Sequence, residues 1–165
     1  YKIVAVQREK DEEVNAGNTA MKLGVNSSLV VKSLVFVVGN SPVLVVLSGS
    51  KKVSLKKLSD CLNLHRDRLR EKGADILVAG SAVSVRLAPS EWAEEYTGYR
   101  IGMIPPFAHS RDMTTIVDKD VLLFPRVFVG CGRLDSELLL EVKDLVAVTD
   151  CIVADVGKEN KAGES

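Results

Sequence analysis

The chain is short of the residues that build metal sites and disulfide frameworks. Its 165 residues include three cysteines and two histidines. Cys61, Cys131 and Cys151 are odd in number and show no C-x-x-C spacing, which argues against a zinc site and a disulfide framework and fits a reducing compartment. His65 and His109 offer little material for a histidine-based metal site. We therefore expect no metal, no cofactor and a cytoplasmic protein.

Net charge, a membrane-spanning run and a serine-nucleophile motif are also lacking. Lys plus Arg and Asp plus Glu both number 22. Attraction of the whole chain to nucleic acid is therefore weak, and any such binding must come from a local patch. No apolar run is long enough to span a membrane, and no signal-peptide pattern opens the chain. No G-x-S-x-G sequence is present, so nothing indicates a serine hydrolase.

The length favours one domain, and a hydrophobic content of 46% is enough to bury a core. The chain begins at Tyr1 rather than Met, and a strand pattern starts at once. This predicts a domain taken from a longer protein, or a chain whose first residues are missing. We place the domain at residues 1–156 and expect the polar residues 157–165 to form a flexible tail.

Short strands are interleaved with short helices along the chain. Strand patterns occur at residues 1–7, 29–38, 43–47, 76–78, 83–87, 114–117, 126–129, 137–140 and 151–156. Helix patterns occur at residues 18–23, 54–62, 90–97 and about 141–148, with a charged helical stretch at 65–72 and a loop at 98–112. Because strict βα alternation is absent, we expect an α+β (mixed α/β) fold with a central mixed sheet and short flanking helices.

One cation interrupts an apolar run, and one loop is rich in Gly and Pro but poor in charge. Lys32 lies between Val30-Val31 and Ser33-Leu34-Val35. A lysine among apolar neighbours needs a counter-charge or a functional reason, unless its aliphatic side chain extends far enough to place the ammonium in water. In the loop, Gly102 permits unusual backbone angles and close approach, and Pro105-Pro106 stiffens the backbone on its C-terminal side. Unless the loop is an ordinary connection, the pair predicts a pocket for a small anionic or carbonyl-bearing ligand.

Three weaker signals accompany this pair. His109 is a candidate general base or a surface loop histidine. The turn at residues 130–135 lacks the third Gly of a dinucleotide loop, which excludes a Rossmann site, but it can line a pocket with Asp135 or Glu137 as the carboxylate. Residues 51–72 contain eight cations and three acids, which form either a solvated helix face or a phosphate-contacting patch.

Taken in order, these segments resemble the YbaK and prolyl-tRNA synthetase-associated editing domains. The matching segments are residues 19–24, 30–35, 55–58, 97–99, 102–106, 115–118, 129–133, 144–145 and 154–156. Lys32 falls on the lysine-bearing strand of that family, and Gly102 and Pro106 fit its G-x-x-x-P loop. The match covers nearly the whole chain in the order of the family.

The resemblance implies a barrel-like mixed sheet and hydrolysis of mischarged aminoacyl-tRNA, in trans or within a synthetase, as in members that clear alanine or cysteine from proline tRNA. Lys32 and Gly102 would be the catalytic residues. The implied substrate-binding residues are Met103, Ile104, Pro106, His109, Gly130 and Glu137, and the implied tRNA-binding residues are Lys51, Lys52 and Lys56. The implied partners are tRNA and an aminoacyl-tRNA synthetase or other domains of the same chain.

The chain departs from the family pattern in places that affect specificity. Val6 and Asn15 stand where cysteine-specific members have aromatic residues, and Pro105 replaces the usual small residue before the loop proline. The charged segment at about 64–82 resembles an insertion. Two alternatives to the deacylase remain: a non-catalytic module that binds tRNA or protein within a larger protein, and a hydrolase of free amino-acid derivatives.

Overall fold

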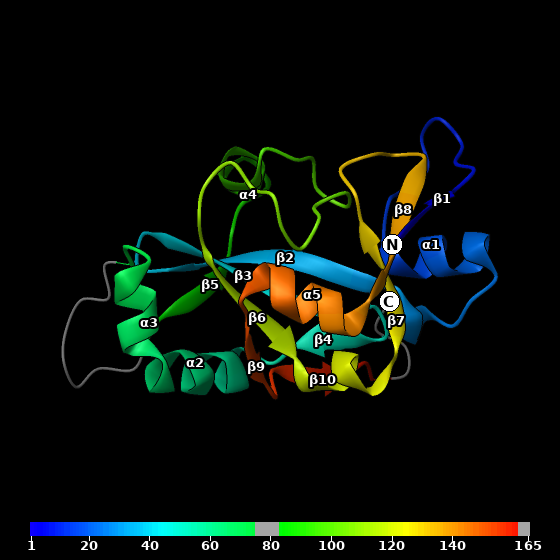
Figure 1. Ribbon diagram of the computed structural model, residues 1–165. Coiled ribbons are helices and arrows are strands. Elements are labelled where there is room, and N and C mark those ends of the chain that lie inside the picture. Colours follow the sequence, from blue (N-terminus) through cyan, green and yellow to red (C-terminus); the bar gives the residue numbers. More distant parts are fainter. Residues whose placement is uncertain (75–82, 162–165) are drawn as a thin grey trace.

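The computed structural model describes residues 1–74 and 83–161, and its centre is a five-stranded mixed sheet (Figure 1). The strand order is β5 (Val85–Leu87), β2 (Val31–Val38), β3 (Ser41–Ser48), β6 (Thr114–Asp118) and β9 (Ile152–Ala154). Strand β2 pairs antiparallel with both β5 and β3, whereas β3, β6 and β9 run parallel to one another. The predicted fold class is confirmed.

Two smaller sheets complete the strand arrangement. Strands β1 (Lys2–Ala5), β8 (Ser136–Glu141) and β7 (Arg126–Gly130) form an antiparallel sheet in that order. A parallel bridge between Val30 and Phe128 joins this sheet to the start of β2. Strand β4 (Lys51–Val53) pairs with β10 (Gly157–Glu159).

Helices cover both faces of the central sheet, because β2 and β3 are apolar on both sides. One core includes Val35, Val37 and Val46 of the sheet with residues of α4 (Ser90–Thr97) and α5 (Val142–Thr149). The other core includes Phe36, Val45 and residues of α2 (Leu55–Leu64) and α3 (Arg66–Glu71). In Figure 1, α4 and α2 accordingly lie on opposite sides of β2 and β3.

Local signals set the helix boundaries, and the predicted ends at Gly24 and Gly98 and the predicted cap at Ser54 are confirmed, whereas α1 begins two residues before the predicted residue 18. Helix α1 (Ala16–Leu23) begins after Asn15, whose side chain accepts a hydrogen bond from the N–H of Asn18, and it ends at Gly24 in the left-handed conformation. Ser54 caps α2 in the same way, and Gly98 ends α4. Two short 3₁₀ helices, Ser27–Leu29 and Lys119–Leu123, precede β2 and follow β6.

Some boundaries differ from the sequence prediction. The flexible tail expected from residue 157 is wrong for its first three residues, because they form β10. The expected strand at 83–87 begins only at Val85, and the one at 76–78 lies outside the described residues. Within the charged segment at 64–82, the described part forms the end of α2 and then α3, which buries Leu69.

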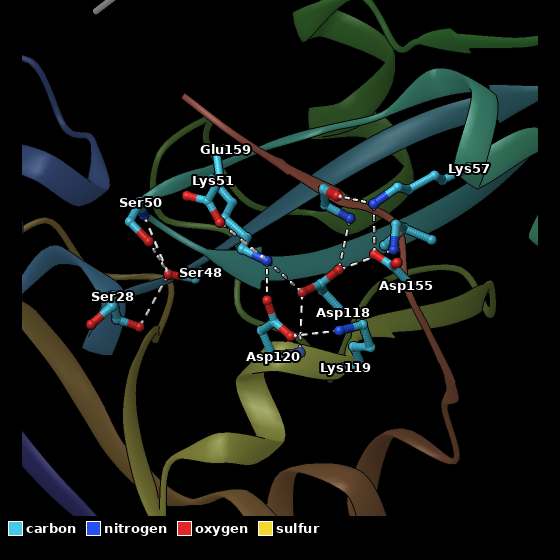
Figure 2. Close-up of polar contacts among 12 residues, drawn as sticks. Ser28, Ser48, Ser50, Lys51, Lys57, Asp118, Lys119, Asp120, Asp155 and Glu159 are labelled. Atoms are coloured by element: carbon cyan, nitrogen blue, oxygen red, sulfur yellow. Dashed lines mark hydrogen bonds and ion pairs between the residues drawn. The ribbon is translucent and has the colours of Figure 1, made fainter. Parts of the chain in front are cut away.

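A buried carboxylate holds the C-terminal strand in place. Asp118 is fully buried and accepts hydrogen bonds from the backbone N–H groups of Val156 (3.0 Å), Gly157 (2.7 Å) and Asp120 (3.2 Å). Figure 2 shows its carboxylate between these groups and the ammonium of Lys51, 4.0 Å away. Asp118 lies on β6, far in the chain from the strand that it holds. The polar sequence after residue 156 therefore does not reveal that this segment is held in place.

We expect Asp118→Ala to lower the free energy of unfolding by roughly 3 kcal/mol, since it leaves several buried N–H groups without an acceptor. Urea unfolding measures the change. The matched control is Asp60→Ala, which removes an exposed carboxylate paired with Lys56 and should change the stability by less than about 0.5 kcal/mol. Equal effects of the two substitutions would contradict the anchoring role.

Candidate functional site

A cavity of about 320 Å³ opens beside the N-terminal half of β2. Its walls come from β2, α1 and the residues before it, the junction of β5 with α4, the 98–112 loop, the end of β7 and the start of β8. Five of the sequence-predicted site residues line it together: Lys32, Gly102, Ile104, Gly130 and Glu137. Segments far apart in the chain thus meet in one hollow whose volume is at the lower end for small-molecule sites.

Lys32 is a half-buried cation in the wall of the cavity. Burial lowers the pKa of its ammonium, and the nearby charge of Lys52 lowers it further. No carboxylate in the described part of the chain forms an ion pair with Lys32. A partly desolvated, unneutralised ammonium of this kind favours an anionic ligand, because the ligand supplies the missing charge.

Glu137 is a carboxyl group of the cavity wall and is almost completely buried, whereas Glu13, which also lines the cavity, is exposed. Burial raises the pKa of its side chain to about 7, and the nearby charge of Arg8 opposes this shift. The pair is long, with 3.4 Å between Nη2 of Arg8 and Oε1 of Glu137, so desolvation outweighs the attraction. A carboxyl that titrates near neutral pH can bind a proton or release it during a reaction.

Arg8 is a residue of the site that the sequence does not predict. Its side chain is 2% exposed, its Nε donates to the carbonyl of Leu134 (2.8 Å), and its Nη2 donates to Oγ1 of Thr19 (2.7 Å). Thr19 and Glu137 both line the cavity, so Arg8 links two wall residues from behind. Arg8 follows a short strand in a polar stretch, and no local pattern distinguishes it from an exposed arginine.

The structure also resolves the choice between Asp135 and Glu137. Asp135 is fully exposed, and hydrogen bonds from Arg133 and Ser136 lower the pKa of its carboxyl to about 2. It does not line the cavity. Of the two carboxylates, Glu137 is therefore the one that a ligand in the cavity can contact.

Glycines bring the 98–112 loop into close contact with the rest of the site. Gly102 has a φ of 86°, and a Cβ there would lie 2.6 Å from the carbonyl oxygen of Val14. A Cβ on Gly130 would lie 2.8 Å from the carbonyl oxygen of Ile104 and 3.0 Å from that of Met103. Both contacts are with backbone, which cannot move aside as a flexible side chain can, so glycine is required at both positions.

The other loop residues expected to bind substrate do not line the cavity. Pro106 is buried, and Met103 contributes its carbonyl to a hydrogen bond from the N–H of Gly132 (2.9 Å). Nε2 of His109 lies 2.7 Å from the carbonyl oxygen of Pro105, and burial lowers the pKa of this imidazole. A neutral His109 that donates to Pro105 braces the loop.

The three lysines expected to bind tRNA lie in different surroundings. Lys51 is 13% exposed and is held by Asp118, Asp120 and Glu159 (Figure 2), which speaks against a phosphate contact. Lys56 is exposed on α2, paired with Asp60. Lys52 is the one whose charge acts on Lys32.

No group of three His, Cys, Asp or Glu side chains within residues 1–74 and 83–161 is arranged to hold a metal ion. In the same residues, no helix is long and apolar enough to cross a membrane.

The Cys131 thiol donates to the carbonyl of Ser136, and burial raises its pKa.

Comparison with known proteins identifies the family. Residues 12–148 match the aminoacyl-tRNA editing domain, and the chain belongs to this family. A Bacillus subtilis (strain 168) relative, the uncharacterized protein YwhH, is 29% identical over 127 residues, which are 76% of this chain and 69% of that protein.

Solved structures agree with this assignment. A candidate trans-editing enzyme for prolyl-tRNA synthetase superposes with a TM-score of 0.76 at 26% identity, covering 95% of this chain and 86% of the other. The hypothetical protein APE2540 has a TM-score of 0.77 at 25% identity, with coverage of 95% and 91%. The fold is therefore that of the editing domains, and their family activity is the deacylation of aminoacyl-tRNA.

The raised pKa of Glu137 makes stability depend on pH. An unfolded glutamate ionises near 4.5, whereas the folded group ionises at about 7, so folding disfavours the charged form. Stability from this group is therefore intact below about pH 4.5 and falls as pH rises to 7, by up to roughly 2–3 kcal/mol. Glu137→Gln should remove this loss, so we expect the variant to gain stability relative to wild type between pH 5 and pH 8. Urea unfolding at both pH values measures it, and a constant difference would contradict the assignment.

The contact at Gly130 predicts a second effect. Gly130→Ala should push the backbone at residues 103–104 away and cost roughly 1–3 kcal/mol of stability. The control is Gly17→Ala in α1, where a Cβ meets only the side chain of Asn15 at 3.4 Å and stability should stay the same or rise by up to about 1 kcal/mol. Thermal unfolding of both variants provides the comparison, and a Gly130→Ala protein as stable as Gly17→Ala would refute it.

Proposed function

We propose that the domain hydrolyses the ester bond of mischarged aminoacyl-tRNA. The observation that carries the proposal is the placement of Lys32 and Glu137 in the wall of one small cavity. The first offers positive charge to the phosphate-bearing end of the RNA, and the second offers an acid–base group to the amino-acid end. This pairing fits a ligand that carries negative charge at its phosphate-bearing end and a polar, titratable group at its amino-acid end. It fits a uniformly charged ligand less well.

The reaction needs no protein nucleophile. Water adds to the ester carbonyl carbon, the bond from that carbon to the ribose oxygen breaks, and the ribose oxygen takes up a proton. An aminoacyl ester is already activated, so the site must mainly position the reactants and stabilise the charge that develops on the carbonyl oxygen. This requirement matches a site lined by one lysine, the carboxyl groups of Glu13 and Glu137, and many backbone groups.

The lining residues Lys32, Gly102 and Glu137 each have a role in this scheme. Lys32 binds the terminal phosphate or the developing negative charge, with Lys52 adding to the positive potential. The backbone around Gly102 faces the ester from the opposite wall. Glu137, whose pKa lies near neutrality, exchanges protons with the attacking water or the amino group, and Arg8 fixes its position.

The small volume of the cavity supports a small amino acid such as alanine, cysteine or serine. The similarity to a candidate trans-editing enzyme for prolyl-tRNA synthetase supports proline tRNA as the carrier. The domain then removes a small, wrongly attached amino acid, either as a free-standing protein or beside other domains. An active site for free amino-acid esters would not need the positive charge at its mouth.

The test is deacylation of Ala-, Cys- and Ser-charged proline tRNA. We expect wild type to release at least one of these amino acids well above the buffer rate. Lys32→Ala should lose about a hundredfold or more of the rate, because a stabilising charge is removed from the reacting group.

The matched control is Lys143→Ala, which removes an exposed lysine of α5 outside the cavity and should stay within about twofold of wild type. No release of any of the three amino acids by wild type would refute the enzyme assignment. Salt-sensitive tRNA binding without turnover would then indicate a binding module. Equal turnover of an aminoacyl ester that lacks tRNA would indicate a small-molecule hydrolase.

A further inference from the structure

Strand β2 is paired along its whole length on one side but only in part on the other. Toward β3, all eight residues from Val31 to Val38 have partners. Toward β5, pairing covers Phe36 to Val38 and is extended by one hydrogen bond, from the N–H of Ala88 to the carbonyl of Val35 (2.9 Å). At the other end, the bridge from Val30 to Phe128 closes the same strand. Between these closures, no described strand pairs with this edge of β2.

The register shows which peptide groups face this gap. In an antiparallel pair, alternate residues direct both their N–H and C=O to the same neighbour. The carbonyl of Val30 accepts from Gly49 on the β3 side (2.7 Å), whereas the carbonyl of Val35 accepts from Ala88 on the β5 side. Even-numbered residues of β2 therefore face β3, and odd-numbered residues face the other edge. The N–H and C=O of Ser33 accordingly point into the gap.

The gap opens into the cavity of the proposed site. Ser33 lies in its wall, together with its neighbours Val31, Lys32 and Val35 and the closing residue Ala88. The cavity therefore contains a strand edge that offers a backbone donor and a backbone acceptor side by side, next to a lysine. A backbone group in a largely buried place is costly to leave without a partner, so this edge is suited to a ligand with complementary groups.

The length of the gap limits the ligand. Strand residues advance about 3.3 Å each, so Val31 and Val35, which flank the gap, are about 13 Å apart. β5 and β7 block any longer strand. One extended residue is enough to exchange two hydrogen bonds with Ser33, and the gap has room for at most about three residues along the strand. An aminoacyl ester has the required pair of groups, namely an ammonium donor and a carbonyl acceptor on neighbouring atoms.

We propose that the backbone of Ser33 binds the aminoacyl group of the substrate as a one-residue strand. Its C=O accepts from the α-ammonium, and its N–H donates to the ester carbonyl oxygen. That same N–H then stabilises the negative charge on this oxygen when water adds to the carbonyl carbon. The inference rests on the proposed function. It adds the group that recognises the α-ammonium and the ester carbonyl, which aminoacyl groups have in common. The surrounding side chains are then left to select the amino acid by size.

Proline provides the first test, because it removes one N–H without altering the charge. Ser33→Pro should fold, since the lost N–H faces the gap and takes no part in the ladder with β3. We expect it to lose about a hundredfold or more of kcat/KM for deacylation. Ser33→Ala keeps the N–H and should therefore retain a kcat/KM at least about tenfold above that of Ser33→Pro. Leu34→Pro, which removes an N–H from the β3 ladder, should fail to fold.

Amide hydrogen exchange provides a second test that needs no variant. In the free protein, the Ser33 amide should exchange faster than the amides of Lys32 and Leu34, which belong to the β3 ladder. A non-hydrolysable alanyl-amide analogue of 3′-aminoacyl-adenosine should slow exchange at Ser33 by about tenfold or more at saturation, and its N-acetyl derivative should bind weakly. No change at Ser33 with the analogue bound would overturn the inference.

The two proposals fail in different ways. If wild type deacylates charged tRNA but folded Ser33→Pro keeps the activity of Ser33→Ala, the role of the Ser33 backbone is refuted while the enzyme assignment stands. If wild type releases no amino acid from any charged tRNA, the enzyme assignment itself fails, and a Ser33 amide unprotected by the analogue would remove the binding role as well.

Discussion

The pairing of β2 with β3 is the constraint on which the site depends. All eight residues of β2 lie opposite a partner residue on β3, and both strands are covered by apolar side chains from helices on either face. This ladder fixes the position of Lys32 along the strand and the direction of every peptide group near it. Because β5 pairs with only the far half of β2, the same rigid strand is a core element at one end and a cavity wall at the other.

The charged side chains of the cavity have fewer close partners of opposite charge than many charged side chains elsewhere in the described part of the protein. Lys32 forms no ion pair with a carboxylate among the described residues, and the ion pair of Glu137 with Arg8 is long, at 3.4 Å. Elsewhere charges are closely matched, as at Asp118, which receives backbone N–H groups and lies near Lys51. Charges that are left partly unsatisfied in a hollow favour a ligand that satisfies them. The glycines at 102 and 130 serve the same end, because they let the loop approach closely enough to form the opposite wall.

Much of the site was predictable because its signals are local. Lys32 stands out against an apolar run, and Gly102 is marked by the prolines a few residues later. Arg8 and Ser33 were not predictable in this way. Arg8 acquires its role only when β1 and β8 bring it beside Glu137, and Ser33 matters through backbone atoms that every residue has. His109 and Lys51 are the reverse case, because their residue types suggest a function but other groups already bind them. His109 bonds to the carbonyl of Pro105 in its own loop, and Lys51 is held by carboxylates from other parts of the chain.

By itself, the sequence determined the fold class, most element boundaries, the family resemblance and the central lysine and glycine, because periodicity, caps and chain order are written in neighbouring residues. Only the tertiary structure decided that Glu137 rather than Asp135 enters the cavity, that residues 157–159 form a strand, and that one edge of β2 is left open. Each of these depends on which distant backbone or side chain arrives to neutralise a charge or to accept a hydrogen bond, and such partners are set by packing across the whole molecule.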